Sequence, residues 1–200
     1  MMNRQTPTRR PAAAGVLWRI VHSEIERSRY DQPMAAATHT MTLPAAMLER
    51  GFWLYVWRVE APEGEFLYVG RTGDTSSPHA TPPYQRMGQH LGHQKTQNAL
   101  RKHLEARRIA PERCYQFHLY AHGPLFPEAP DMAAHVSPRN IVAAMEKALA
   151  DELTAAGYDV LNTVDCRKPL HEERFAIVRS AFAQHFPTLR SSSADTGGSP

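Results

Sequence analysis

The chain has 200 residues, of which 42% are hydrophobic, and its formal net charge is +3 at pH 7. This length suits one domain with extensions, and this composition can bury a core, which excludes a chain that is disordered throughout. No run approaches the roughly 18 apolar residues of a membrane span. Cys114 and Cys166 form neither a CxxC pair nor a disulfide framework, which excludes a zinc finger and predicts a cytoplasmic protein without a membrane partner.

The first 50 residues predict an N-terminal extension with one or two helices. Apolar side chains recur at the spacing of an amphipathic helix over residues 16–29. Arg19 interrupts the apolar run of this segment early, so it is interpreted as a helix and not as a signal peptide. A second, short helix is predicted over residues 44–50, with Pro44 in its first turn.

The next segment predicts a β-hairpin followed by helices. Residues 52–59 and 66–70 are aromatic and β-branched, and residues 61–65 between them carry turn chemistry. A loop rich in Gly, Ser and Pro follows over residues 72–83. The remaining elements expected here are helices over residues 84–93 and 97–108 and a third strand over residues 114–121.

The C-terminal part of the chain predicts two further helices. After a loop over residues 124–135, Ser137 as N-cap and Pro138 at the first helical position open a long helix. A last amphipathic helix is expected over residues 169–186. The Ser/Gly-rich residues 188–200 carry no folding signal and are predicted to be a disordered tail.

Residues 51–187 therefore predict a small mixed α/β (α+β) domain, because three strands with few crossover connections do not build a doubly wound sheet. Its charge is uneven. Residues 71–113 carry eight Lys/Arg against three Asp/Glu, whereas residues 114–200 carry seven against ten. A basic segment beside an acidic one is typical of a surface that binds nucleic acid, and a solvated helix face is the alternative.

Glu146 has unusual neighbours for a charged residue. On the helix predicted after Ser137, the residues three and four positions away are all apolar: Val142, Ala143, Leu149 and Ala150. A carboxylate in this position faces inward or into a cleft, without a cation on its own helix to pair with. It then needs a metal, a partner or a raised pKa. The alternative is a glutamate that reaches water from the edge of the apolar stripe.

Four further side chains and a basic neighbour suit phosphate chemistry. Arg86 and His90 are four residues apart and share a helix face. Arginine offers a planar fork of donors to a phosphate, and histidine can carry a proton, although a solvated helix face explains both as well. Tyr55 and Tyr68 lie on the two hairpin strands, where packing is the ordinary role of tyrosine. Arg71 follows a glycine that would let a phosphate come close.

In this order along the chain, these residues resemble the GIY-YIG nuclease superfamily. Trp53-Leu54-Tyr55 stands where that family has GIY, and Tyr68-Val69-Gly70 stands where it has YIG. Four later positions resemble the family's arginine and histidine on the next helix, its metal-ligating glutamate and the asparagine after it: Arg86, His90, Glu146 and Asn162. The first motif keeps only its tyrosine, and the stretch before Arg86 implies a loop insertion. The resemblance covers roughly residues 52–163.

The resemblance implies a three-stranded antiparallel sheet flanked by helices, and metal-dependent hydrolysis of phosphodiester bonds in DNA, with RNA as an alternative. One divalent cation, Mg²⁺ or Mn²⁺, would lie on Glu146. Tyr55 would take a proton from the attacking water, directly or through a neighbour, with its pKa lowered by nearby cations. Arg86 would stabilise the transition state. The residues that would orient water and phosphate or brace the site are Tyr68, His90 and Asn162.

Further residues of the basic segment are expected to contact the nucleic acid: Arg71, Lys95, Arg101 and Lys102. Sequence specificity would come from the loops, the flanks, a homodimer or a protein partner. The main alternative is a catalytically inactive nucleic-acid-binding module on the same scaffold. Another is a structural domain whose Arg and Glu residues form ion pairs. The presence of all six polar positions of the family favours the enzyme.

Overall fold

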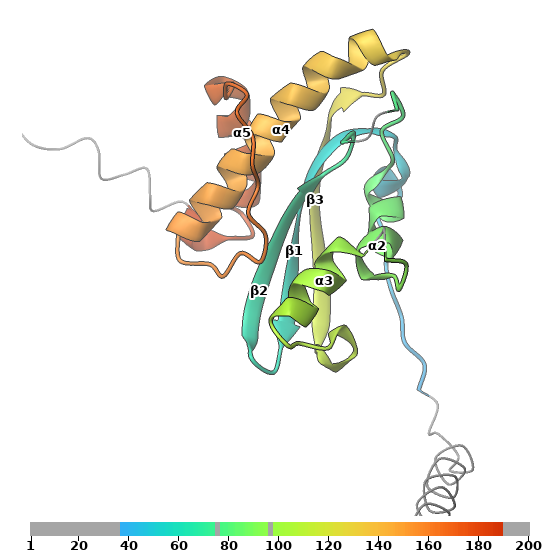
Figure 1. Cartoon of the computed structure of the whole chain (residues 1–200), viewed down its shortest axis with the longest axis vertical. Coiled ribbons are helices and arrows are strands. Elements are labelled where there is room, and N and C mark those ends of the chain that lie inside the picture. Colours follow the sequence, from blue (N-terminus) through green and yellow to red (C-terminus); the bar gives the residue numbers. More distant parts are fainter. Residues whose placement is uncertain (1–36, 75–76, 96–97, 190–200) are drawn as a thin grey trace, which may run out of the picture. The chain divides into compact units, whose positions relative to one another are not determined.

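The computed structural model describes residues 37–74, 77–95 and 98–189. The chain divides after Thr42, and the fold below concerns the unit that begins at Leu43. The helix predicted over residues 16–29 and the tail from residue 190 lie outside the described residues. In chain order, the elements are η1 (Ala45–Leu48), β1 (Gly51–Ala61), β2 (Gly64–Arg71), α2 (Pro83–Leu91), α3 (Ala99–Ala106), η2 (Pro111–Arg113), β3 (Gln116–Pro127), α4 (Met132–Ala155) and α5 (Glu172–Phe182) (Figure 1).

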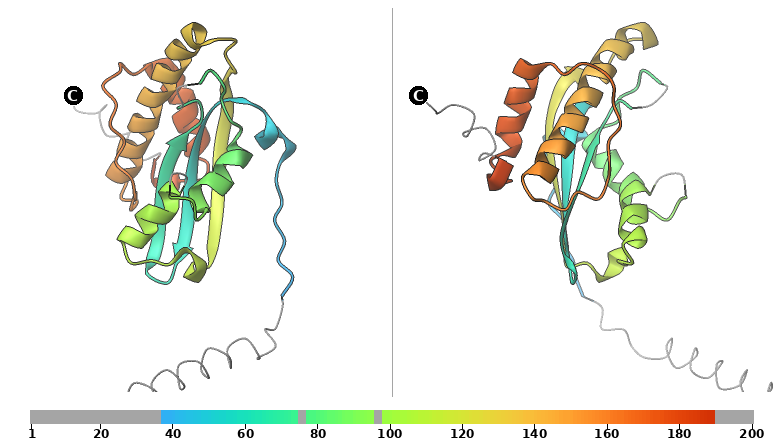
Figure 2. Two further views of the ribbon diagram at one scale, coloured as in Figure 1. Left: turned by 45° about the vertical axis from the view of Figure 1, so that its right-hand side comes forward. Right: turned by 60° about the vertical axis from the view of Figure 1, so that its left-hand side comes forward.

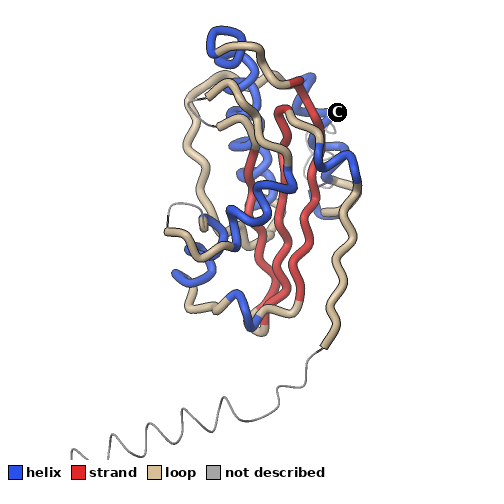
Figure 3. The backbone as a smooth tube through the Cα atoms, turned by 90° about the vertical axis from the view of Figure 1, so that its right-hand side faces the viewer, coloured by secondary structure: helices blue, strands red, loops and turns tan. Residues whose placement is uncertain are grey.

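The three strands form the expected antiparallel sheet (Figure 3). Their order in the sheet is β2-β1-β3. The hairpin register places Tyr55 opposite Gly70 and Trp57 opposite Tyr68, so both tyrosines point to the same face of the sheet. A segment after α4 adds a short parallel bridge at the outer edge of β2, between Leu67 and Val160. The predicted mixed α+β architecture is confirmed.

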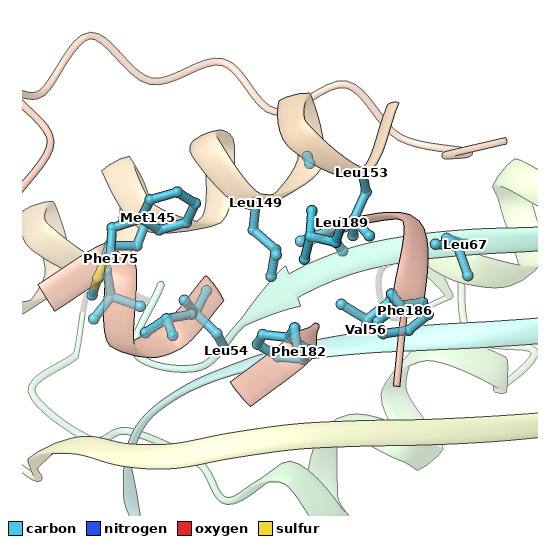
Figure 4. Close-up of a cluster of buried hydrophobic side chains, with 14 of the residues drawn as sticks. Leu54, Val56, Leu67, Met145, Leu149, Leu153, Phe175, Phe182, Phe186 and Leu189 are labelled. Atoms are coloured by element: carbon cyan, nitrogen blue, oxygen red, sulfur yellow. The ribbon is translucent and has the colours of Figure 1, made fainter. Parts of the chain in front are cut away.

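Helices cover both faces of the sheet, with α4 and α5 on one side and α2 and α3 on the other (Figure 2). The first core joins Leu54 and Val56 of β1 to side chains of α4, α5 and the residues after α5, among them Met145, Leu149, Phe182 and Phe186 (Figure 4). The second core packs Tyr55, Trp57, Val59 and Tyr68 against Leu100, Leu104 and Ile109. The aromatic and β-branched run of β1 follows from this, because a central strand covered on both faces needs no polar side.

Several boundaries differ from the prediction. Strand β3 continues to Pro127 because Phe126 pairs with Phe52 across a bulge, so the loop expected from Pro124 is partly strand. The first helix of this unit, η1, is a short 3-10 turn after Pro44. The helix expected over residues 169–186 covers only Glu172–Phe182, where two glutamates in the first turn suit the helix dipole.

The predicted start of α4 at Ser137 is wrong. The helix begins six residues earlier, where the N-cap Asp131 accepts a hydrogen bond through its carboxylate from the Ala134 amide at 2.9 Å. Pro138 therefore lies inside the helix. The first turn is held by His135, which is fully buried, packs on the Phe52 ring and lies 3.0 Å from the Gly73 carbonyl. These contacts are distant in sequence, so no local signal reveals them.

Among the described residues, no helix is both long and apolar enough to cross a membrane.

Candidate active site

A polar pocket of about 240 Å³ lies beside the C-terminal half of β2, and five of the six predicted catalytic residues gather there. Both sheet faces contribute to it, since α4 supplies Glu146 while the tyrosines lie on the side of α2 and α3. The residues that line the pocket are Tyr55, Tyr68, Gly70, Arg71, Asp74, Arg86, Gln89, His90, Asn98, Ala99 and Glu146. Nine polar residues separated by up to 91 positions in sequence thus meet in one cavity.

Tyr55 reaches the pocket across the backbone of Gly70. A Cβ atom on Gly70 would lie 2.5–2.6 Å from the end of the Tyr55 ring, a distance that real side chains do not tolerate. The glycine therefore lets the ring lie flat against β2. The Tyr55 hydroxyl then meets Nε2 of His90 at 2.7 Å. This close approach is the structural reason for a glycine at the end of the Tyr68-Val69-Gly70 motif.

The Tyr55–His90 pair is buried, with 1% of Tyr55 and 5% of His90 exposed. Burial raises the pKa of Tyr55 well above its ordinary value, and the opposing charge of Arg86 does not reverse this. Burial also lowers the pKa of His90 to about 4, helped by the charge of Arg86. The two side chains are therefore a neutral phenol and a neutral imidazole near pH 7. Desolvation outweighs the charge of Arg86, so the protein's own cations do not give the lowered pKa that was expected for Tyr55.

Tyr68 packs edge-on against His90, with ring centroids 5.0 Å apart. Its other ring neighbour is His103 of α3, at 5.6 Å. Burial and the charge of Glu146 raise the pKa of Tyr68 to about 12. This phenol therefore keeps its proton at neutral pH and can donate a hydrogen bond into the pocket.

Arg86 is held in place by three acceptors. Its guanidinium donates to Oε1 of Gln89 at 3.0 Å and to the Arg71 carbonyl at 3.2 Å, and it forms an ion pair with Asp74. Its Nε is buried and has no partner among the described residues. Arg86 therefore presents a fixed positive charge and an unused donor at the pocket.

Glu146 forms an ion pair with Arg71 across the pocket wall. The Arg71 Nε lies 2.8 Å from Oε2 of Glu146, and the two side chains are 17% and 15% exposed. Burial raises the pKa of Glu146 to about 6, although Arg71 acts to lower it. The prediction that this glutamate faces inward is confirmed, and its cationic partner comes from β2.

Asn162 lies outside the pocket but supports it from behind. Its amide continues the edge pairing of β2: Nδ2 donates to the Val69 carbonyl at 2.8 Å and Oδ1 accepts from the Val69 amide at 3.0 Å. Val69 separates Tyr68 from Gly70, so this side chain fixes the backbone that carries both. The bracing role expected for Asn162 matches this geometry.

The other residues expected to bind nucleic acid lie outside the residues that line the pocket. The Arg101 guanidinium is occupied by Glu112 at 2.7 Å and by the Leu91 carbonyl at 3.0 Å, so it joins α3 to its surroundings. Lys102 is exposed and donates to the Lys95 carbonyl. Of the four predicted contacts, Arg71 alone is a pocket residue.

Three polar residues of the pocket were not predicted from the sequence: Asp74, Gln89 and Asn98. Asp74 lies in a loop without periodicity, and Gln89 is an ordinary helix residue. Asn98 precedes α3, where an asparagine usually caps the helix through its side chain. Here it makes no capping bond, is 8% exposed, and leaves Oδ1 without a partner among the described residues. An N-cap residue that faces a pocket is recognisable only in three dimensions.

The pocket fits a weakly held, hydrated divalent cation better than a closed metal site. No group of three or more His, Cys, Asp or Glu side chains that could hold a metal occurs in the part of the chain that the structure describes. Mg²⁺ usually keeps several waters and takes one or two protein carboxylates together with substrate phosphates. Glu146 could supply one such oxygen, and Asp74 is in the same pocket.

Comparisons with protein-family models, with curated proteins and with solved structures give no match for this chain.

Replacing Gly70 with alanine should disrupt the pocket more than the fold. The new methyl group must displace the Tyr55 ring, which separates its hydroxyl from His90 and lowers the unfolding free energy by about 1–3 kcal/mol. Urea unfolding measures the loss of stability. The matched control is Gly88→Ala on α2, where nothing lies within 4 Å of the added atom and a small gain is expected. Equal stability of the two variants would contradict the proposed packing.

Proposed function

We propose that this protein is a metal-dependent endonuclease that hydrolyses phosphodiester bonds in DNA. The observation that supports this most is that a fixed arginine, a hydrogen-bonded tyrosine–histidine pair and a buried carboxylate share one small pocket. Such perturbed groups gather at catalytic sites more often than elsewhere. Each supplies a part that phosphodiester hydrolysis requires.

Arg86 would bind the scissile phosphate. Its fixed guanidinium and unpartnered Nε suit an oxygen that gains negative charge in the transition state. Arg71 adds a second buried donor, since its Nη1 also has no partner among the described residues. The Arg86 guanidinium is already in place and needs no reorganisation when the charge develops, and removing such a group typically costs about 10²–10³ in rate.

The Tyr55–His90 pair would take the proton of the attacking water. A phenolate is not accessible at neutral pH because burial raises the pKa of Tyr55. We therefore propose a relay in which the water proton moves to the Tyr55 oxygen while the Tyr55 proton moves to Nε2 of His90. The 2.7 Å separation suits this transfer, and the low pKa of His90 keeps the imidazole neutral at pH 7. The relay requires the tautomer with its proton on Nδ1, in which Nε2 accepts. The water oxygen then attacks the phosphorus, and the 3′ oxygen leaves.

Glu146 would hold the divalent cation, Mg²⁺ or Mn²⁺. When bound, such a cation supplies Lewis acidity at the phosphate and charge stabilisation at the leaving oxygen. Tyr68 would donate its hydroxyl proton to the water or to a phosphate oxygen, because its raised pKa keeps the phenol neutral. Asn162 would act indirectly, through the β2 backbone.

The main alternative is a catalytically inactive module that binds nucleic acid with the same scaffold. Nucleic-acid affinity arises mostly from exposed cations along the phosphate backbone. Here the two arginines of the pocket are each 17% exposed, and a neutral tyrosine–histidine pair is buried beside them. A binding surface has no need of this burial, which favours catalysis. RNA is the other substrate with the same phosphodiester chemistry.

A nicking assay tests the proposal. Wild-type protein with Mg²⁺ should convert supercoiled plasmid to the open circular form, and EDTA should stop the conversion. Glu146→Gln should abolish nicking, because the amide keeps the shape but loses the charge that holds a cation. Asp151→Asn, a carboxylate on the same helix that pairs with Lys147 outside the pocket, should retain activity. Nicking that survives in Glu146→Gln would refute the site. Binding of DNA without cleavage, under Mg²⁺ and Mn²⁺ alike, would favour the inactive module.

The pH dependence of cleavage should follow Glu146. Its pKa is raised to about 6, so the carboxylate is mostly charged at pH 7 and mostly protonated at pH 5. At Mg²⁺ concentrations below saturation, single-turnover rates should therefore fall about tenfold per pH unit below 6. Saturating Mg²⁺ should move the midpoint to lower pH, because cation and proton compete for the same oxygens. A flat profile from pH 5 to 8 at low Mg²⁺ would contradict this assignment.

A further inference from the structure

We infer that Arg71 is an exchangeable counterion, which pairs with Glu146 in the metal-free protein and turns to the substrate phosphate when a divalent cation takes that carboxylate. This inference rests on the proposed function, because it assigns the cation to Glu146. Arg71 would then couple the binding of the cation to the binding of the substrate phosphate, in addition to contacting that phosphate.

The ion pair itself is the first reason. Arg71 and Glu146 are mostly withdrawn from water, and their 2.8 Å contact joins β2 to α4. A buried pair of this kind is strongly destabilised when one partner is lost, since the other charge remains desolvated and uncompensated. A cation that occupies Glu146 therefore leaves Arg71 in need of another anion. Within the proposed reaction, that anion is the phosphate.

The contrast with Arg86 is the second reason. Arg86 is held by Asp74, Gln89 and the Arg71 carbonyl, so its guanidinium is fixed from three directions. Arg71 contacts Glu146 through Nε, while its buried Nη1 has no partner among the described residues. A guanidinium with one strong contact and an unused donor can rotate about its side-chain bonds without breaking backbone pairing. Of the two arginines, Arg71 therefore has the side chain that can change its partner more easily.

The charge balance of the pocket is the third reason. Two arginines face two carboxylates, Glu146 and Asp74, so these four side chains sum to zero near neutral pH. A divalent cation adds two positive charges, and a phosphodiester removes one of them. Each ligand therefore lowers the electrostatic cost of the other. Cation and nucleic acid should bind with positive coupling, and Arg71 is the group that carries the coupling.

Calorimetric titration of full-length protein with Mn²⁺ alone tests the exchange without any cleavage. Arg71→Gln removes the competing charge, so it should bind Mn²⁺ about tenfold more tightly than wild type. Arg107→Gln removes a surface arginine that pairs with Asp159, and should leave the Mn²⁺ affinity unchanged. Thermal melting checks that each variant is folded. Where Arg71→Gln does not fold, Arg71→Lys serves instead, with an affinity above that of wild type because lysine cannot reproduce the Nε contact.

A double-mutant cycle on DNA binding in EDTA supplies the second measurement. Arg71→Gln should change the affinity for a short duplex by less than about twofold, because Glu146 occupies the arginine when no cation is bound. In the Glu146→Gln background the arginine is released, so adding Arg71→Gln should weaken binding about tenfold. A merely structural arginine would give the same change in both backgrounds.

The outcomes separate the two proposals. Equal or weaker Mn²⁺ binding by Arg71→Gln, in a protein whose wild type binds Mn²⁺ and nicks DNA, would overturn the exchange and leave the endonuclease standing. Folded wild-type and Arg71→Gln proteins that both fail to bind Mn²⁺ would overturn the metal site, and the exchange with it. Tighter binding by the variant supports the exchange even if no DNA substrate is cleaved.

Discussion

The contact of the Tyr55 ring with the backbone of Gly70 is the constraint on which the site depends. It holds only in the observed hairpin register, because a slip of one residue would turn Tyr55 to the other face of the sheet. In this register the hydroxyl crosses β2 and meets His90, which ties α2 to the sheet. Because Arg86 lies one turn before His90, the same contact brings to the pocket the arginine that we propose binds the phosphate.

Around this contact, the charged side chains of the pocket form ion pairs, whereas Tyr55 and His90, which are proposed to transfer the proton, are neutral. Desolvation raises the pKa of Tyr55 and lowers that of His90, so neither is charged near pH 7. Arginine and glutamate remain charged because they face each other. In the proposed reaction, these pairs would keep the site stable before the substrate binds, and Arg71 would become available to the phosphate when a cation replaces it at Glu146. Its activity would therefore depend on ligand order as well as on residue identity.

The sequence predicts the parts of the fold that local patterns determine. The hairpin follows from turn residues between two β-branched runs, and the inward direction of Glu146 follows from its apolar helical neighbours. The errors arise where distant contacts decide. Ser137-Pro138 is a good local helix start and Asp131 is another, and the distant contacts of the buried His135 with Phe52 and Gly73 hold the earlier start. Asp74 carries no pattern at all, since its role is defined by the arginine that it meets. The raised pKa of Tyr55 depends on the burial of its side chain, which the spacing of residues in the sequence does not reveal.

Anomalous scattering from a crystal of the protein with Mn²⁺ and a short DNA duplex would locate the cation and the phosphate together. We expect one Mn²⁺ peak within bonding distance of a Glu146 carboxylate oxygen, with a phosphate in contact with Arg86 and the guanidinium of Arg71 turned toward that phosphate. A Mn²⁺ peak elsewhere, with Arg71 still paired to Glu146 and no phosphate within reach of Arg86, would contradict the proposed site.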